Sequence, residues 1–157
     1  MQNTIQTFPA RRLTLAQPTD LVLVDPCYLV PAGLWGSFVD QIPQKGRIGG
    51  TAALHTGGFM LWGTTAYGDG FYGITSNPLK VGVMGEGAGV DSGLLALVPA
   101  DDALALLGAA SLPAGCALLI EDVTGEVYTD GRGRFELRHM AVVIDTAACD
   151  EVDAEVQ

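Results

Sequence analysis

The segment Gly125–Ile144, "GEVYTDGRGRFELRHMAVVI", contains the strongest indication of the fold. At its centre, Asp130–Gly133 has the composition of a tight turn, because Asp-Gly favours a hairpin and glycine accepts positive φ. Apolar and polar side chains alternate from Phe135 to Met140, and the chain then becomes wholly apolar. Alternation of this kind is typical of a strand with one buried face. The segment therefore predicts a hairpin of two strands, Gly125–Thr129 and Arg134–Ile144.

The rest of the chain has a similar composition. Short apolar runs are separated by 21 glycines and 8 prolines, and the usual glycine share is only about 7%. This pattern predicts a mainly β, β-rich α+β fold: a compact antiparallel sandwich or barrel-like sheet with one or two short helices. The other predicted strands are Leu21–Asp25, Phe59–Thr64, Gly70–Thr75, Leu79–Met84, Gly93–Val98 and Cys116–Asp122.

Two segments predict short helices. In "PADDALALLG", Pro99–Gly108, the proline suits the first turn, the two aspartates favour its positive end, and the glycine favours termination. In "PAGLWGSFVDQI", Pro31–Ile42, apolar residues recur at helical spacing. Between the strands and helices, the glycine-rich stretch Gln44–Gly58 is predicted to be a loop.

Length and charge limit the classes of protein. The 157 residues predict one β-rich domain over residues 1–148, followed by an acidic, flexible tail over residues 149–157. A net charge of −10 disfavours nucleic acid as a partner. Charged residues make up only 17% of the chain and hydrophobic residues 48%, so we expect a homo-oligomer that hides some apolar surface.

The cysteines and the N-terminus indicate where the protein works. Cys27, Cys116 and Cys149 show no C-x-x-C spacing, and an odd, sparse count favours a reducing compartment. No export signal is visible. The uncharged run Ala103–Ile120 contains glycine and proline and lacks flanking lysine or arginine, so we expect no membrane span. We expect a soluble, cytoplasmic protein.

Motifs that define common cofactor sites and catalytic sites were not found. The glycine-rich segments match neither a dinucleotide nor a phosphate-binding fingerprint, and no cofactor is predicted. There is no G-x-S-x-G elbow, and His55 and His139 are too far apart in sequence for a zinc-ligand spacing. A triad of Ser92, a histidine and an aspartate can be drawn, but with so many acids the coincidence means little.

Three aspartates lie in turn-like contexts. Asp25 ends an apolar run in "LVLVDPCYLVP", Asp69 lies between glycines in "YGDGFYG", and Asp91 begins "VDSG". If they converged they could bind Mg²⁺ or Ca²⁺, which prefer oxygen ligands. We favour no metal, because turn chemistry explains each aspartate separately. In that interpretation, replacement of any of the three by asparagine costs little.

Cys27 and the nearby aromatic residues have two interpretations each. A catalytic thiolate needs a base or a positive field, and no basic residue is close to Cys27 in sequence, so we expect a small buried hydrophobe. Tyr28, Tyr67, Phe71 and Tyr72 lie beside glycine-rich turns and could form a stacking wall, although core packing is the default.

Taken in order, "DPCY", "GDGFY" and "VDSG" resemble an uncharacterised group of small bacterial and phage proteins that carry DPCY, GDG-x-Y and VD[SA]G. The resemblance covers about Leu21–Pro99. It implies no known activity, but it implies that the motif residues belong together on one side of the fold. We therefore take as candidate ligand-binding residues Asp25, Tyr28, Asp69, Tyr72, Asp91 and Ser92.

Three functions remain open. The favoured one is a binding module, such as a phage or bacterial accessory protein that binds a host protein or sequesters a small ligand. The second is a metal-dependent hydrolase that uses Asp25, Asp69 and Asp91, with His55 or His139 as proton carrier. The third is a structural component of a particle.

Overall fold

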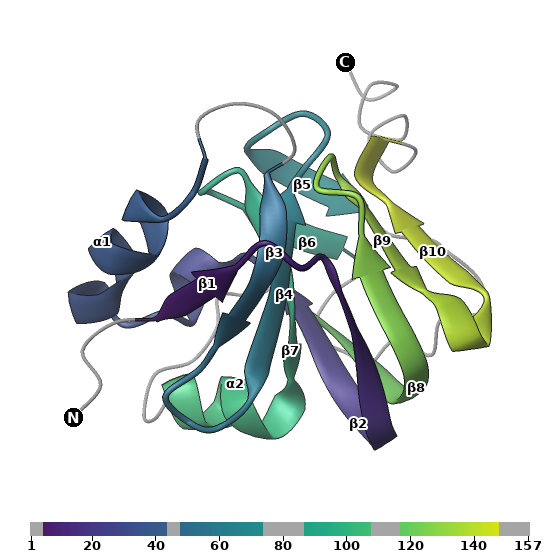
Figure 1. The fold of residues 1–157 in the computed structure, drawn as a ribbon. Helices are drawn as coiled ribbons and strands as arrows, with labels where there is room; N and C mark the ends of the chain where they lie inside the picture. The colour runs from purple at the N-terminus through teal and green to yellow at the C-terminus, as the bar shows by residue number, and fades with distance from the viewer. Residues whose placement is uncertain (1–4, 44–47, 74–86, 108–116, 148–157) are drawn as a thin grey trace.

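The computed structural model describes residues 5–43, 48–73, 87–107 and 117–147 (Figure 1). The strands and helices in this part of the chain are β1 (Gln6–Phe8), β2 (Arg12–Val24), α1 (Ala32–Asp40), β3 (Gly49–Ala53), β4 (Phe59–Thr64), β5 (Gly70–Gly73), β6 (Gly87–Val90), β7 (Leu94–Pro99), α2 (Ala100–Leu107), β8 (Ala117–Thr129), β9 (Arg134–Leu137) and β10 (Val142–Asp145). Eight strands form one antiparallel sheet in the order β1-β3-β4-β7-β2-β8-β9-β10, and β5 pairs with β6. The predicted mainly β fold class, with two short helices, is confirmed.

The sheet bends because its two longest strands bend together. β2 and β8 each have 13 residues, and their pairing shifts register between Leu15 and Thr19 and again between Thr19 and Leu21. On β8, Asp122 and Gly125 have positive φ values of 56° and 75° near the same place. Irregularities of this kind bend strands and let a sheet fold over itself.

The bend divides the sheet into two layers. The front layer contains the first part of β2, the second part of β8, and β9 and β10. The back layer contains the remainder of β2 and β8 together with β7, β4, β3 and β1. The helices α1 and α2 contribute residues to a separate core on the other side of the back layer.

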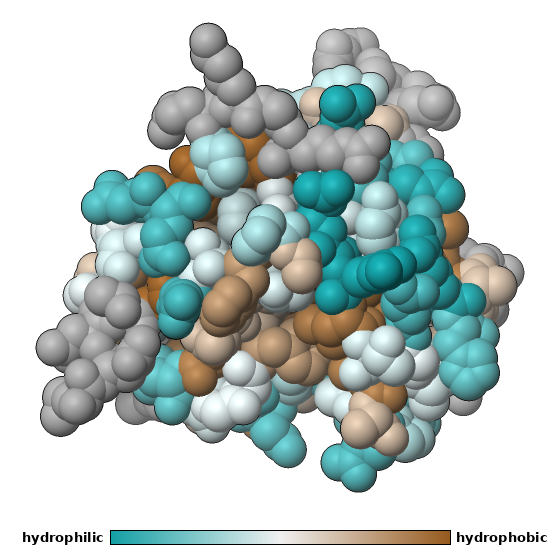
Figure 2. All heavy atoms as spheres, in the orientation of Figure 1, coloured by the Kyte–Doolittle hydropathy of each residue, from teal (hydrophilic) through white to brown (hydrophobic). Residues whose placement is uncertain are grey.

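The outer face of the front layer is polar. Figure 2 shows hydrophilic residues over the β8–β10 side of the molecule. Arg134 and Arg138 each donate from Nε to Glu136 at 2.8 Å, and the Arg138 guanidinium lies 4.0 Å from the ring centroid of Tyr128. Alternation along the strands therefore places charge outside and apolar side chains inside, as expected for a sheet with one wet face.

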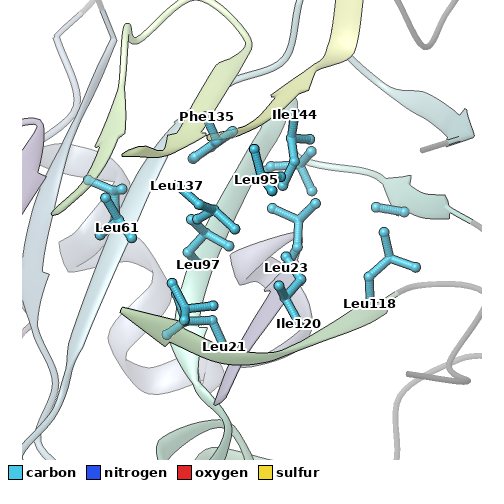
Figure 3. Packing of buried hydrophobic residues seen from close by; sticks show 14 of the residues in the cluster. Leu21, Leu23, Leu61, Leu95, Leu97, Leu118, Ile120, Phe135, Leu137 and Ile144 are labelled. Atoms are coloured by element: carbon cyan, nitrogen blue, oxygen red, sulfur yellow. The ribbon is translucent and has the colours of Figure 1, made fainter. Parts of the chain in front are cut away.

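The main core lies between the layers (Figure 3). Phe135 and Ile144 come from the front layer, and Leu21 and Leu97 from the back layer; all four side chains are fully buried. Burial of a side chain of this size contributes about 1.5–3 kcal/mol. In the second core, under α1, Phe38 contacts Trp62 edge to face, with ring centroids 5.4 Å apart.

Several element boundaries differ from the prediction. The two predicted strands Cys116–Asp122 and Gly125–Thr129 join in β8, because Gly125 turns the strand without ending it. The predicted strand Arg134–Ile144 instead breaks at a short 3-10 turn, Arg138–Met140, and reverses into β10 through Ala141, whose φ is 56°. Local alternation does not reveal such a reversal, since both arms have apolar inward residues.

One predicted loop contains a strand, and two predicted segments lie where the structure describes no residues. β3 lies inside the predicted loop Gln44–Gly58, since its glycines and alanines carry no strand-like pattern but pair with β4. The predicted strand Leu79–Met84 and the acidic tail lie outside the described residues. Neither α1 nor α2, the helices of the described part, has the length or apolar run that crossing a bilayer requires.

Candidate functional site

The DPCY sequence forms the turn that ends β2. Pro26–Tyr28 is a single 3-10 turn, and Asp25 caps it by accepting from the Cys27 amide at 2.8 Å. Proline suits the first position of such a turn because its nitrogen has no hydrogen to leave unpaired. This half of the Asp25 interaction agrees with the predicted turn role.

The other half of the interaction joins Asp25 to the VDSG turn, 66 residues further along the chain. Oδ2 of Asp25 accepts from the amides of Asp91, at 2.7 Å, and Ser92, at 2.8 Å. The Ser92 hydroxyl donates to Oδ1 at 2.6 Å. With the Cys27 amide, the carboxylate receives four hydrogen bonds while its residue is 0% exposed. The expectation that Asp25 stabilises only its own turn is therefore wrong.

Tyr28 and Asp91 lie beside this buried carboxylate. The Tyr28 hydroxyl donates to Oδ2 of Asp91. Asp91 is exposed, and Tyr28 is half-buried. Because the Asp91 amide is bonded to Asp25, the backbone that carries this tyrosine–carboxylate pair is held in one position.

The GDG motif lies next to VDSG. The Thr65 amide donates to the Gly93 carbonyl at 3.0 Å. Gly93 has a positive φ of 74°, and a Cβ there would lie 3.8 Å from Oδ1 of Asp69. Asp69 is exposed, and Tyr67 is 60% exposed.

Tyr72 has a structural position in this loop. Its hydroxyl donates to the Gly68 carbonyl at 2.8 Å and accepts from the Tyr67 amide at 3.1 Å. Its side chain is 1% exposed and belongs to the core between the layers. The structure therefore gathers the six candidates into one region, but places Asp25 and Tyr72 where a ligand cannot reach them.

The geometry does not favour the metal alternative. A carboxylate offers about four acceptor positions, and all four on Asp25 are used by protein donors. Within the described part of the chain, no three His, Cys, Asp or Glu side chains are arranged to hold a metal ion.

A serine–histidine arrangement also receives no support. The Ser92 hydroxyl donates to Asp25. His139 lies on the front layer, where Nδ1 is 2.8 Å from the Thr124 hydroxyl, and His55 is exposed on the loop between β3 and β4.

Cys27 is half-buried, so the expectation of a buried position is wrong. It lines an open hollow of about 370 Å³ together with Val30, Ala32 and Trp35. Trp35 is one of the apolar residues that recur at helical spacing in Pro31–Ile42, and no site role was predicted for it. The helix α1 begins at Ala32, shortly after the DPCY turn ends at Tyr28, and Trp35 on its first turn lines the hollow.

Comparison with protein families finds no match, and neither the curated proteins nor the solved structures contain a match.

Proposed function

We propose that this protein is a small binding module, and that its binding surface is formed by Tyr28, Asp69 and Asp91. The observation that carries the proposal is the buried Asp25 carboxylate, which joins two turns and fixes the backbone next to Tyr28 and at Asp91. Taking a charge out of water is costly, and well-packed apolar residues often serve stability as well or better. A rigid, polar support is instead what a binding site needs in order to hold its contact groups in one geometry.

The exposed groups indicate the chemistry of the ligand. Asp69 and Asp91 are exposed carboxylates, and Tyr67, in the same loop as Asp69, offers an exposed aromatic ring. Carboxylates pair with ammonium and guanidinium groups, and an aromatic face attracts them. The proposed ligand is therefore a cationic group, presented by a basic protein segment or by a small amine. By its motif resemblance, the module is an accessory protein of a phage or bacterium.

The test uses conservative surface variants. Binding of a fluorescent hexa-arginine peptide is measured by anisotropy for wild type, Tyr28→Phe, Asp91→Asn and Asp69→Asn. Asp40→Asn, an exposed acid on α1, is the matched control because it removes the same charge elsewhere. We expect at least tenfold weaker binding in Asp91→Asn and wild-type binding in Asp40→Asn.

Equal weakening in Asp40→Asn and Asp91→Asn would show attraction to the net negative charge alone and contradict a defined site. Absence of binding to hexa-arginine, to spermidine and to acetyl-lysine amide would contradict the cationic ligand.

A further inference from the structure

The first residues of β2 form an open edge of the front layer. Arg12 to Leu15 pair with β8, whereas β7 pairs with β2 only from Leu21 onward. No other pairing of these four residues exists within the described ranges 5–43, 48–73, 87–107 and 117–147. Such an edge presents backbone donors and acceptors that a further strand can use.

An apolar groove runs beside this edge. It has a volume of about 250 Å³ and lies between the two layers, with Leu13 on one side and Phe59 on the other. Both side chains are only half-buried and continue the main core outward. Phe8 lines the same groove and is 41% exposed. Figure 2 shows hydrophobic residues at the centre of this view, around the position of β1 in Figure 1.

We propose that a second copy of this chain docks here, by antiparallel pairing of the two Arg12–Leu15 edges across a two-fold axis. The pairing would extend the front layer through both copies, and Phe8 and Leu13 of each copy would be covered. Closure by a two-fold axis uses the same patch on both chains, so assembly stops at a dimer.

Charge distribution is the reason to choose a second copy. The chain has a net charge of −10, so two copies repel across most surfaces. Every Lys or Arg of the described residues lies on or next to the front layer: Arg11, Arg12, Arg132, Arg134 and Arg138. On its outer face three arginines are balanced by Glu126, Glu136 and Asp145 in one network of ion pairs. Two copies can therefore meet at this layer without the repulsion that operates elsewhere.

The pairing also gives Arg12 a second partner. Arg12 is 71% exposed at its side chain and lies 3.7 Å from Glu126 of its own chain. Glu126 lies on β8, directly opposite Thr14 of β2. If Leu13 lies near the two-fold axis, Arg12 of the second copy lies opposite Thr14 of the first. The backbone of that Arg12 is then two strands, or about 10 Å, from the backbone of Glu126. An arginine side chain can reach across this distance. Each Glu126 is then approached by an arginine from each copy.

The edge is short, which limits other pairings. Register shifts begin after Leu15, and Pro18 follows without an amide hydrogen. Prolines and bulges of this kind protect an edge against open-ended association. Only the four residues before the bend are therefore offered for pairing.

The first experiment measures molar mass by light scattering after size exclusion at about 100 μM. Wild type is expected to have twice the chain mass. Phe8→Ser and Thr14→Lys are expected to elute as monomers, because both side chains are exposed at the groove or edge and neither belongs to the buried core. Leu104→Ser is the matched control: Leu104 is 67% exposed on α2, so this change removes exposed apolar surface away from the edge, and the variant should stay dimeric.

The charge arrangement is tested separately. Arg12→Glu should raise the dimer dissociation constant at least tenfold, and Arg12→Glu combined with Glu126→Arg should restore it. Monomeric wild type at 100 μM, or a dimer unaffected by Phe8→Ser, Thr14→Lys and Arg12→Glu alike, overturns the proposal.

Cross-linking keeps the proposal testable if a variant fails to fold. In a chain with Cys27, Cys116 and Cys149 changed to serine, Thr14→Cys should be joined to itself by a short bis-maleimide, whereas Ala105→Cys on α2 should not. Equal cross-linking at both positions overturns the two-fold edge pairing.

Discussion

Replacement of Asp25 by asparagine should destabilise the protein strongly, even though the two side chains have nearly the same shape. Asparagine keeps one acceptor oxygen but replaces the other by an amino group that only donates. The least costly orientation keeps oxygen toward the amides of Asp91 and Ser92, which lie 2.7 and 2.8 Å from Oδ2. The amino group then faces the Cys27 amide, 2.8 Å from Oδ1, so that two donors oppose each other.

The magnitude follows from these contacts. One buried backbone donor becomes unsatisfied, which costs roughly 1–3 kcal/mol, and the remaining bonds lose the strengthening that a charged acceptor provides. Relief from burying a charge offsets part of this loss. We expect a net destabilisation of about 2–4 kcal/mol, or a decrease in Tm of about 5–15 °C for a chain of this size.

The assay is thermal and urea unfolding followed by circular dichroism. Asp69→Asn and Asp91→Asn are the controls, since both side chains are exposed and such substitutions usually stay within about 0.5 kcal/mol of wild type. A melting temperature of Asp25→Asn within about 2 °C of wild type, with an unchanged urea midpoint, would refute the view that this carboxylate joins the two turns.

Three further predictions concern the stability of the two-layered sheet. Gly133→Ala should cost at least about 2 kcal/mol more than Gly57→Ala, because φ is positive at both, 106° and 102°, but only at Gly133 does a new Cβ collide with other atoms, the Thr146 hydroxyl oxygen and the Ala66 amide nitrogen; equal urea midpoints would contradict this. The hydrogen bond from Arg134 lowers the pKa of Glu136 below its usual value of 4.5, so its stabilisation is complete above that value and is lost as pH falls through the lowered pKa; Glu136→Gln should therefore be less stable than wild type at neutral pH, with a difference that closes in acid, and a pH-independent difference would argue against the ion pair. Leu97→Ala, at a fully buried position between the layers, should cost about 2–5 kcal/mol in urea unfolding, whereas a loss below about 1 kcal/mol would mean that the layers close over the gap.

Elements with a strong local signal were predictable from the sequence. Phe59–Thr64 is a strand with the predicted bounds, and Ala100–Leu107 forms the helix expected from its proline and aspartates. The hairpin at Asp130–Gly133 also forms, with Asp130 accepting from the Arg132 and Arg134 amides at 2.7 and 3.1 Å. In each case the residues that determine the structure are neighbours in sequence.

Structure that depends on distant partners was not predictable. β3 is a strand because β1 and β4 pair with it on either side, and "GGTAA" has no preference that would indicate this. The bend of β2 requires that the four steps from Leu15 to Thr19 face only two steps on β8, from Gly125 to Val123, and these two strands are far apart in the chain. The Asp25 carboxylate likewise has its Ser92 partner 67 residues away. Pattern analysis within a short window cannot contain such pairs.

The geometry also gives the DPCY and VDSG segments of this chain a structural connection. Asp25 supplies the acceptor, Pro26 begins the turn, and Ser92 supplies an amide and a hydroxyl, so these residues form one structural unit. Their contribution to the stability of the fold is enough to explain why all three are present. Tyr28 and the Asp91 side chain stand outside that unit: they contact each other at the surface, and the Asp25 bonds would persist without them. Folding therefore accounts for the aspartate, proline and serine of the motifs, and in part for Tyr28, which is half-buried and packs against the second core. It does not account for the exposed Asp91 carboxylate. The Asp91 carboxylate is therefore the motif side chain on which the proposed binding surface depends most.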